Sequence, residues 1–244
     1  MHNVWREENT NITASIWKYF KLDRLINSLS SRQIYFPAAS QFEDPFEGAT
    51  MVMKKNIMDI DERLHEDDLG ANNAFRELCR LTKINCWHIS EYESYLMWAY
   101  YAQNCKGVAI KTTIERLLNS LYAFRLQENY EDENIYWGNV KYIDLHQKRL
   151  RVNALERFFY KHRVFESENE FRLIISLRLA EEFGVIVPEE GISVSFDPGV
   201  LIENLYIGPQ ISDDNKAAIV NVCTELGIED RIVNSSLLGH PWYA

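Results

Sequence analysis

Apolar residues recur along this chain in two spacings, and each spacing predicts one kind of secondary structure. Alternation of apolar and polar residues indicates a strand, whereas apolar residues three and four apart indicate an amphipathic helix. Together the segments predict an α+β fold built on a mixed, mostly antiparallel central sheet. The strand patterns cover residues 16–20, 33–37, 84–89, 105–111, 136–142, 168–175, 184–187, 191–196, 204–207 and 228–233, and the helical patterns cover residues 23–30, 93–101, 113–121, 147–160 and 213–226.

Two segments fall outside this regular pattern. Residues 1–14 are polar and predict an N-terminal arm, and residues 54–83 predict a charged helical insertion or cap that is interrupted at Gly70. The helix at 93–101 is apolar on most of its faces, so we expect it in the interior. No internal repeat, low-complexity tract or linker divides the sequence, and a single domain over residues 1–244 is the economical interpretation.

The stretch from Phe158 to Ile175 carries the main candidate chemistry. From Glu168 onward charged and apolar residues alternate, so a strand there would place Glu168, Glu170 and Arg172 on one face. Side chains two apart on a strand face are about 7 Å apart, close enough for Arg172 to keep a neighbouring carboxylate ionised. Such carboxylates can bind a sugar hydroxyl, orient water or face a developing cation. An exposed ladder of charges on a surface strand explains the same pattern without catalysis.

Charge limits the classes of partner. With 26 Lys and Arg residues against 36 Asp and Glu residues, the net charge is −10, which disfavours nonspecific binding to nucleic acid. A local basic block between Lys148 and Arg163 keeps a nucleic-acid-processing effector open as an alternative, although a solvated helix face explains it too. Binding through that block would weaken steeply with salt.

Cysteine usage and the N-terminal residues suggest a cytoplasmic protein. The four cysteines form no C-x-x-C pair, as expected for reduced thiols. The first residues lack the apolar core of a secretion signal, and no run is long enough to span a bilayer. The acidic loop at 40–48, in which Phe46 is expected to anchor and Asp44 or Glu47 to face inward, has no nearby histidine. We therefore expect no metal.

Several familiar catalytic motifs are missing. The sequence has no G-x-G-x-x-G, no G-K-[ST] loop and no G-x-S-x-G elbow, so dinucleotide-binding folds, phosphate loops and serine hydrolases find no support. Cys86 and His88 share one face of a predicted strand, which favours a buried thiol beside a hydrogen-bonded histidine over a nucleophile pair. The remaining candidates for a common site with the Glu168, Glu170 and Arg172 face are Lys18, Tyr19, His88, Trp98 and Tyr101.

An ordered series of motifs over residues 17–236 resembles the bacterial family known as domain of unknown function 2971. The series is more specific than any one of its parts, and the family name itself implies no activity. It comprises Phe36 and Phe42-x-Asp44-Pro45-Phe46-Glu47, then Cys86-Trp87, Met97-Trp98-x-x-Tyr101-Ala102 and Lys106-Gly107-Val108-x-Ile110, then Lys161-x-x-x-Phe165-x-x-Glu168-x-Glu170-Phe171-Arg172, and finally Ile207-Gly208-Pro209.

A second resemblance, at the level of the fold, is to ADP-ribosyltransferases. It implies that Glu170 is the catalytic carboxylate that stabilises an oxocarbenium-like transition state at the nicotinamide ribose, with Glu168 as its helper. It also implies that Lys18 contacts phosphate or ribose and that Tyr101 stacks on nicotinamide. The expected function is an NAD- or nucleotide-dependent enzyme, in the setting of a phage-defence or toxin effector, with NAD as substrate. The alternative is a non-catalytic ligand-binding or protein-interaction domain.

Overall fold

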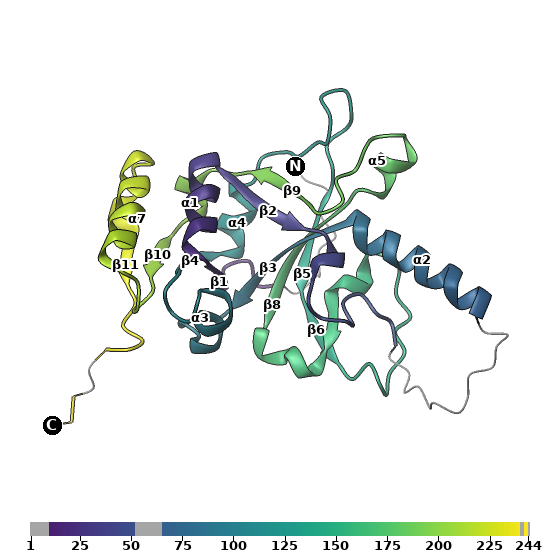
Figure 1. Ribbon diagram of the computed structural model, residues 1–244, viewed down its shortest axis with the longest axis horizontal. Helices are drawn as coiled ribbons and strands as arrows, with labels where there is room; N and C mark the ends of the chain where they lie inside the picture. Colours follow the sequence, from purple (N-terminus) through teal and green to yellow (C-terminus); the bar gives the residue numbers. More distant parts are fainter. Residues whose placement is uncertain (1–9, 52–64, 240–241, 244) are drawn as a thin grey trace. The chain divides into compact units, whose positions relative to one another are not determined.

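The computed structural model describes residues 10–51, 65–239 and 242–243, and it has the predicted α+β architecture (Figure 1). Its central sheet has seven strands. The prediction of a mixed, mostly antiparallel sheet is confirmed, because among the described registers of this sheet only β10 and β11 pair in parallel. In spatial order the strands are β11 (Ile232–Asn234), β10 (Asn204–Ile207), β4 (Val108–Thr113), β1 (Ser15–Phe20), β3 (Thr82–Ile89), β8 (Glu170–Ser176) and β5 (Ile135–Asn139).

Two short pairs of strands and a set of helices complete the described chain. The strand pairs are β2 (Gln33–Pro37) with β9 (Gly191–Ser195), and β6 (Lys141–Ile143) with β7 (Tyr160–His162). The α-helices are α1 (Leu22–Ser31), α2 (His65–Leu81), α3 (Tyr95–Tyr101), α4 (Ile114–Ser120), α5 (Arg178–Glu182), α6 (Pro198–Leu201) and α7 (Asp213–Glu225), and the 3-10 helices are η1 (Ala39–Gln41), η3 (Glu156–Phe159), η4 (Arg163–Glu168) and η5 (Glu229–Arg231). No helix among the described residues combines the length and the apolar character that crossing a membrane requires.

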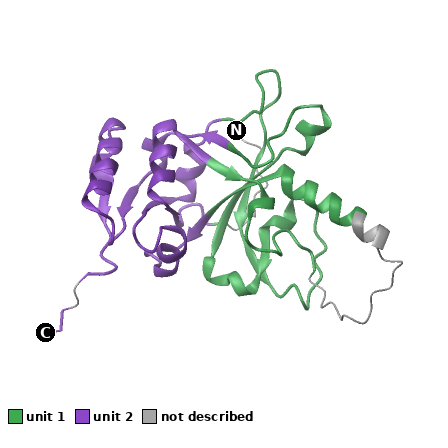
Figure 2. Ribbon diagram, in the orientation of Figure 1, with its two compact units in different colours: residues 1–10, 35–86, 123–192 green, residues 11–34, 87–122, 193–244 purple. Residues whose placement is uncertain are grey.

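The chain forms two compact units (Figure 2). Unit 1 comprises residues 1–10, 35–86 and 123–192, and unit 2 comprises residues 11–34, 87–122 and 193–244. The predicted single domain with an insertion at 54–83 stays a prediction. Most of the predicted arm (residues 1–9) and the start of the predicted insertion (residues 54–64) lie outside the described residues, and α2 occupies the remainder up to Leu81.

Unit 2 is organised around a cluster of buried aromatic residues. Trp17 and Tyr19 from β1 pack with Trp98 from α3, and the Tyr19 and Trp98 rings meet edge to face with their centroids 5.1 Å apart. Gly107 immediately precedes β4, and a Cβ atom at this position would lie 2.1 Å from the carbonyl oxygen of Phe20. The glycine is therefore required by close backbone packing.

Unit 1 has its own core, and a glycine again decides how a loop enters it. Phe158, Ile84 and Ile174 are completely buried in one cluster. Gly48 has a φ of +72°, and a Cβ atom at this position would lie 2.5 Å from the Phe158 ring. Glycine permits both the left-handed backbone and the close approach. The loop can therefore turn Glu47, which is 5% exposed, into the interior, as predicted for Asp44 or Glu47.

Some predicted elements are wrong. Residues 147–155 are not helical, and the expected basic helix is reduced to η3, whose Phe158 and Phe159 are buried. Residues 184–187 form no strand although their burial alternates, because no neighbouring strand pairs with them in the described part of the chain. Gly70 does not interrupt α2, because a single glycine costs a helix only about 1 kcal/mol.

The prediction that helix 93–101 lies in the interior is also wrong. The helix forms as α3, but only Trp98 is buried, whereas Tyr95, Leu96 and Tyr100 are 55%, 49% and 78% exposed. The buried indole of Trp98 is enough to hold so short a helix against the aromatic cluster of unit 2. The tyrosine hydroxyls tolerate water at their ends, so hydropathy alone overestimated how much of this helix is covered.

Candidate functional site

The candidate site in unit 1 begins where η4 ends and β8 starts. The imidazole Nδ1 of His162 accepts a hydrogen bond from the backbone N–H of Val164 at 3.3 Å, which starts η4. Asn169 ends η4 in a left-handed conformation with φ of +37°. The strand therefore begins at Glu170 rather than at the predicted Glu168, because Asn169 interrupts the extended backbone.

Arg172 is the centre of a buried ion-pair cluster that consists of Glu47, Lys161, Glu168, Glu170 and Arg172. The Arg172 guanidinium binds both carboxylate oxygens of Glu47, at 2.6 and 3.0 Å. Its Nε donates to Glu170 Oε2 at 2.7 Å, and its Nη1 also donates to the carbonyl oxygen of Phe158 at 2.7 Å. This two-sided geometry uses the planar fork that distinguishes arginine from lysine.

Lys161 links the two glutamates of the predicted pair. Its Nζ donates to Glu170 Oε1 at 2.8 Å and also bonds to Glu168 Oε2. The same ammonium lies 4.7 Å from the centre of the Phe165 ring, a cation–π contact that covers it. Glu168 and Glu170 are thus held on one side by a single cation, although Glu168 is not in the strand.

The members of the cluster differ in how much of each side chain is exposed to solvent. Arg172 is completely buried, and the side chains of Glu47, Glu170 and Lys161 are only 3%, 6% and 6% exposed. The Glu168 side chain is 18% exposed, so among these five it has the largest contact with solvent. Glu168, Glu170 and Arg172 do lie in one cluster, but the predicted row on a strand face is wrong for Glu168, which belongs to η4. The alternative of a solvent-exposed ladder is wrong for Glu170 and Arg172.

The two glutamates have pKa values shifted in opposite directions. Burial raises the pKa of Glu168, and the hydrogen bond with Glu170 raises it further. Burial alone would also raise the pKa of Glu170, but the charges of Arg172 and Lys161 outweigh it and hold that pKa well below its usual range. Adjacent carboxyl groups that share a cation commonly divide in this way, with one ionised and the other retaining a proton to higher pH.

The backbone around the cluster is also fixed. The Tyr142 hydroxyl accepts a hydrogen bond from the Glu170 backbone N–H at 2.9 Å, and burial raises the pKa of Tyr142. The Phe42 ring lies 5.7 Å from the Arg172 guanidinium carbon. These contacts keep water away from the charges and so strengthen the interactions among them. The result is a rigid carboxylate pair with one edge open to solvent.

The other predicted ligand-contacting residues lie in unit 2. Tyr19 accepts a hydrogen bond from the Ser94 backbone N–H at 2.9 Å and lies 6.5 Å from His88, ring centre to ring centre. Lys18 contacts the Trp87 ring at 5.6 Å. The structure thus brings Tyr19, His88 and Trp98 together, while Tyr101 is 45% exposed. That these residues form one site with the carboxylate pair stays a prediction.

A histidine cluster near the carboxylates was not anticipated from the sequence. His146 and His162 meet edge to face at 5.3 Å, with Phe46 against both rings. The nearest carboxylate oxygen to His162 Nε2 belongs to Asp144, at 3.8 Å. Within the described part of the chain, no group of three or more His, Cys, Asp or Glu side chains is arranged to hold a metal ion.

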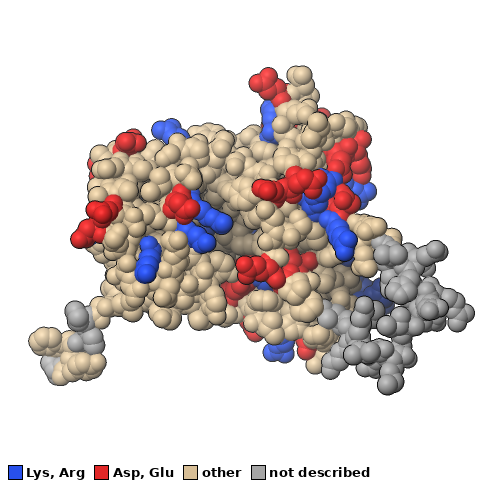
Figure 3. Space-filling view, viewed as in Figure 1, with Lys and Arg blue, Asp and Glu red and all other residues tan. Residues whose placement is uncertain are grey.

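The basic block that suggested nucleic acid is only partly exposed, since Lys148, Arg149, Arg151 and Arg163 reach the surface and the others are covered. Lys161 and His162 are buried, and Arg157 lies over the Phe75 ring. On the face shown in Figure 3, the cationic side chains of the described residues are scattered among acidic and uncharged ones and form no continuous basic area. A polyanion would therefore meet mixed charge there.

Sequence reasoning missed two members of the cluster. Glu47 was expected to face inward without a named partner, and Lys161 was assigned to a basic helix face. A loop that places an acid just before a glycine was the available signal for Glu47. For Lys161, the 3-10 turn between β7 and β8 brings residue 161 back to residue 170, and no pattern in the sequence predicts that turn.

Comparison with known families gives one match. The family model described as "Protein of unknown function (DUF2971)" matches residues 97–173, which include most of α3, all of β4 and the carboxylate pair. The resemblance seen in the sequence motifs is confirmed over that segment. No curated protein and no solved structure matches the chain, and the likeness to ADP-ribosyltransferases finds no support from these comparisons.

Proposed function

We propose that the chain is an enzyme that cleaves the bond between nicotinamide and ribose in NAD or a related nucleotide, with Glu168 and Glu170 as its carboxylate pair. One observation carries this proposal, the opposite pKa shifts of two adjacent carboxyl groups of which one reaches solvent. Pairs of titratable groups with divergent pKa values are typical of acid–base sites.

Burial favours a division of roles within the pair. Glu170 is 5% exposed and bound by Lys161 and Arg172, so it acts as a positioning residue rather than as the group that meets the substrate. Glu168 has the open edge and the raised pKa, which makes it the stronger base. The sequence resemblance implies the reverse assignment, with Glu170 in contact with the ribose.

The proposed step is a displacement at the ribosyl carbon. The bond from that carbon to the nicotinamide nitrogen breaks, and its electron pair leaves with the ring, which becomes neutral nicotinamide. A water molecule or a hydroxyl of a target attacks the carbon, and the Glu168 carboxylate accepts the proton of the attacking group. The negative charge of the pair also stabilises the oxocarbenium-like transition state.

Release of nicotinamide from ring-labelled NAD by the purified full chain tests the proposal. General base catalysis is worth about 10²–10⁴-fold, so Glu168→Gln should lose at least about 100-fold in rate. Glu166→Gln is the matched control, because it removes one acidic charge from an exposed position of the same 3-10 helix. Melting temperatures of both variants separate a catalytic loss from unfolding.

The pH dependence gives a second, independent readout. A base must be ionised to act, so the rate should rise with pH through the pKa of Glu168, which burial raises above the usual value of a glutamate. A wild-type chain that releases no nicotinamide from NAD or NADP, or a Glu168→Gln variant as active as the wild type, would refute the proposed chemistry.

A second candidate function, a protein-interaction domain, is favoured by the exposed side of α3. Tyr95, Leu96 and Tyr100 are 55%, 49% and 78% exposed, and tyrosine is enriched where proteins bind one another. Under this function the ion-pair cluster is structural, and Glu170→Gln lowers the melting temperature without affecting binding. Light scattering of the wild type and of Tyr95→Ser/Tyr100→Ser tests self-association through this face. A nucleic-acid partner, a cytoplasmic location and a phage-defence or toxin setting stay predictions.

A further inference from the structure

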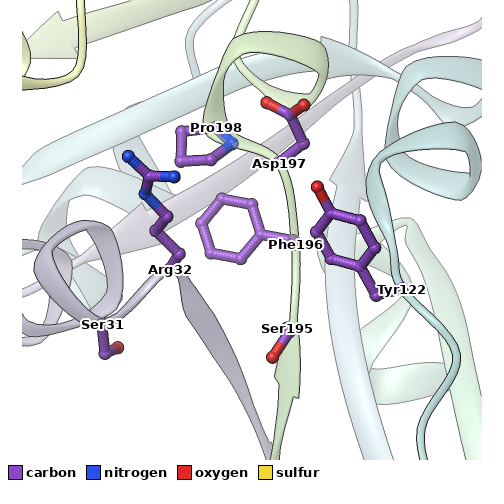
Figure 4. Close-up of a pocket in the computed structure, with 7 residues that line it drawn as sticks. All are labelled: Ser31, Arg32, Tyr122, Ser195, Phe196, Asp197 and Pro198. Carbon is purple, nitrogen blue, oxygen red and sulfur yellow. The ribbon is translucent and has the colours of Figure 1, made fainter.

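A hollow of about 270 Å³ lies in unit 2, between the C-terminal end of α1 and the segment that joins β9 to α6. In Figure 4 the Arg32 guanidinium and the Tyr122 ring lie on either side of the Phe196 ring, and the Asp197 carboxylate is drawn above these two rings. The volume is slightly below the range of about 300–1,000 Å³ that holds drug-sized ligands. The hollow therefore suits a small metabolite.

The walls of the hollow are fixed to one another by backbone hydrogen bonds. The N–H of Phe196 donates to the carbonyl oxygen of Arg32 at 3.0 Å, and the N–H of Tyr122 donates to the carbonyl oxygen of Ser195 at 3.0 Å. Three segments far apart in the sequence are thus held at defined positions. A preorganised site of this kind binds a ligand without first ordering its own walls.

Arg32 occupies a backbone position that ordinarily belongs to glycine. It is the C-cap of α1 with φ of +51° and ψ of +40°, the left-handed conformation in which glycine is the usual residue. An arginine there is strained, and strain in a folded protein is commonly retained where the side chain has a function. None of the ion pairs found among the described residues involves Arg32, so a structural ion pair does not account for it.

Asp197 supplies the opposite charge in a fixed orientation. Its Oδ1 accepts the backbone N–H groups of Gly199 and Val200, at 2.8 and 3.2 Å, and Oδ2 has no hydrogen bond to the described residues. Arg32 and Asp197 thus line the same hollow without contacting each other. A bound molecule with an anionic and a cationic group would satisfy both.

We propose that this hollow binds a free α-amino acid with an uncharged side chain. Its carboxylate would take the planar donors of Arg32, a pairing that guanidinium groups make in two parallel hydrogen bonds. Its ammonium group would bind Asp197 Oδ2, and its side chain would lie against the ring of Tyr122, which is 56% exposed. The site is separate in composition from the carboxylate pair and independent of the NAD chemistry.

Isothermal titration calorimetry of the full chain with L-leucine, L-valine and glycine tests the proposal. We expect at least one of them to bind with a Kd below about 1 mM. N-acetyl-leucine lacks the ammonium group and leucine methyl ester lacks the carboxylate. Because hydrogen bonds to charged groups are worth roughly 10- to 100-fold in affinity, each derivative should bind at least about tenfold more weakly than the parent amino acid.

Three variants locate the site. Arg32→Gly should weaken binding at least about tenfold while raising the melting temperature, since glycine relieves the left-handed strain. Asp197→Asn keeps the oxygen that caps α6 but removes the charge for the ammonium group, and should also weaken binding at least about tenfold. Arg24→Gln, an exposed change on the same helix away from the hollow, is the control and should leave the Kd unchanged.

Three results would overturn the proposal. Absence of heat for all three amino acids at about 10 mM, where a Kd of about 1 mM would already saturate the site, overturns the proposal. Equal affinity for leucine and its two derivatives overturns it as well. So does unchanged binding in a folded Arg32→Gly protein, because the ligand would then occupy some other place.

Discussion

Replacing Arg172 by methionine should destabilise the protein more than any exposed charge substitution. Methionine fills similar space, but the change leaves the Glu47 and Glu170 carboxylates buried without their shared cation, at side-chain exposures of 3% and 6%. Removing one partner of a buried ion pair costs about 3–5 kcal/mol. For a chain of this size that corresponds to a fall in melting temperature of roughly 6–20 °C.

Urea unfolding at neutral pH measures this loss, and an exposed ion pair provides its control. Arg178 binds Glu182 at 2.8 Å, but both side chains are more than half exposed, so Arg178→Met should cost less than about 1 kcal/mol.

A triple variant tests the explanation itself. If the cost comes from unpaired charge, adding Glu47→Gln and Glu170→Gln to Arg172→Met should restore part of the lost stability. A triple variant less stable than the single one, or a loss below about 1 kcal/mol for Arg172→Met, would refute the reasoning. The pH dependence gives a further sign check, since the lowered pKa of Glu170 stabilises the fold above the pKa of an unfolded glutamate. That stabilisation is lost as the pH falls through the lower folded value.

Three further predictions concern other parts of the chain. Lys83 is completely buried, and burial lowers its pKa to about 8, so urea unfolding should show stability rising between about pH 8 and pH 10.5 in the wild type but not in Lys83→Met. Gly107→Ala should cost about 1–3 kcal/mol, because its Cβ would lie 2.1 Å from a carbonyl oxygen, whereas Gly70→Ala, with no atom within 4 Å, should raise stability by about 0.5–1 kcal/mol. Thr113→Ala should cost about 1 kcal/mol in the same assay, since its hydroxyl caps α4 at 3.2 Å.

Most of the α+β fold follows from local patterns. The aromatic run at 16–20, the apolar run at 84–89 and the helical spacing at 213–226 predicted elements close to those observed, because each has apolar residues that any tertiary structure must bury. Thr113 caps α4 through a hydrogen bond that depends only on neighbouring residues, which makes such a cap readable from local sequence. The predicted helix at residues 147–160 was wrong because the spacing of apolar residues there did not distinguish a helix from a loop. The predicted burial of α3 was wrong because exposure depends on the rest of the fold.

The candidate site divides in the same way between sequence and structure. The spacing of Glu168, Glu170 and Arg172 marked a charged group from the sequence alone. Only the tertiary structure decided that Arg172 is wholly buried, that Glu47 arrives from a loop 125 residues earlier, and that Lys161 joins the two glutamates. Local sequence fixes which charges are close along the chain, whereas burial and long-range pairing depend on how distant segments pack, and these determine which carboxyl group keeps its proton.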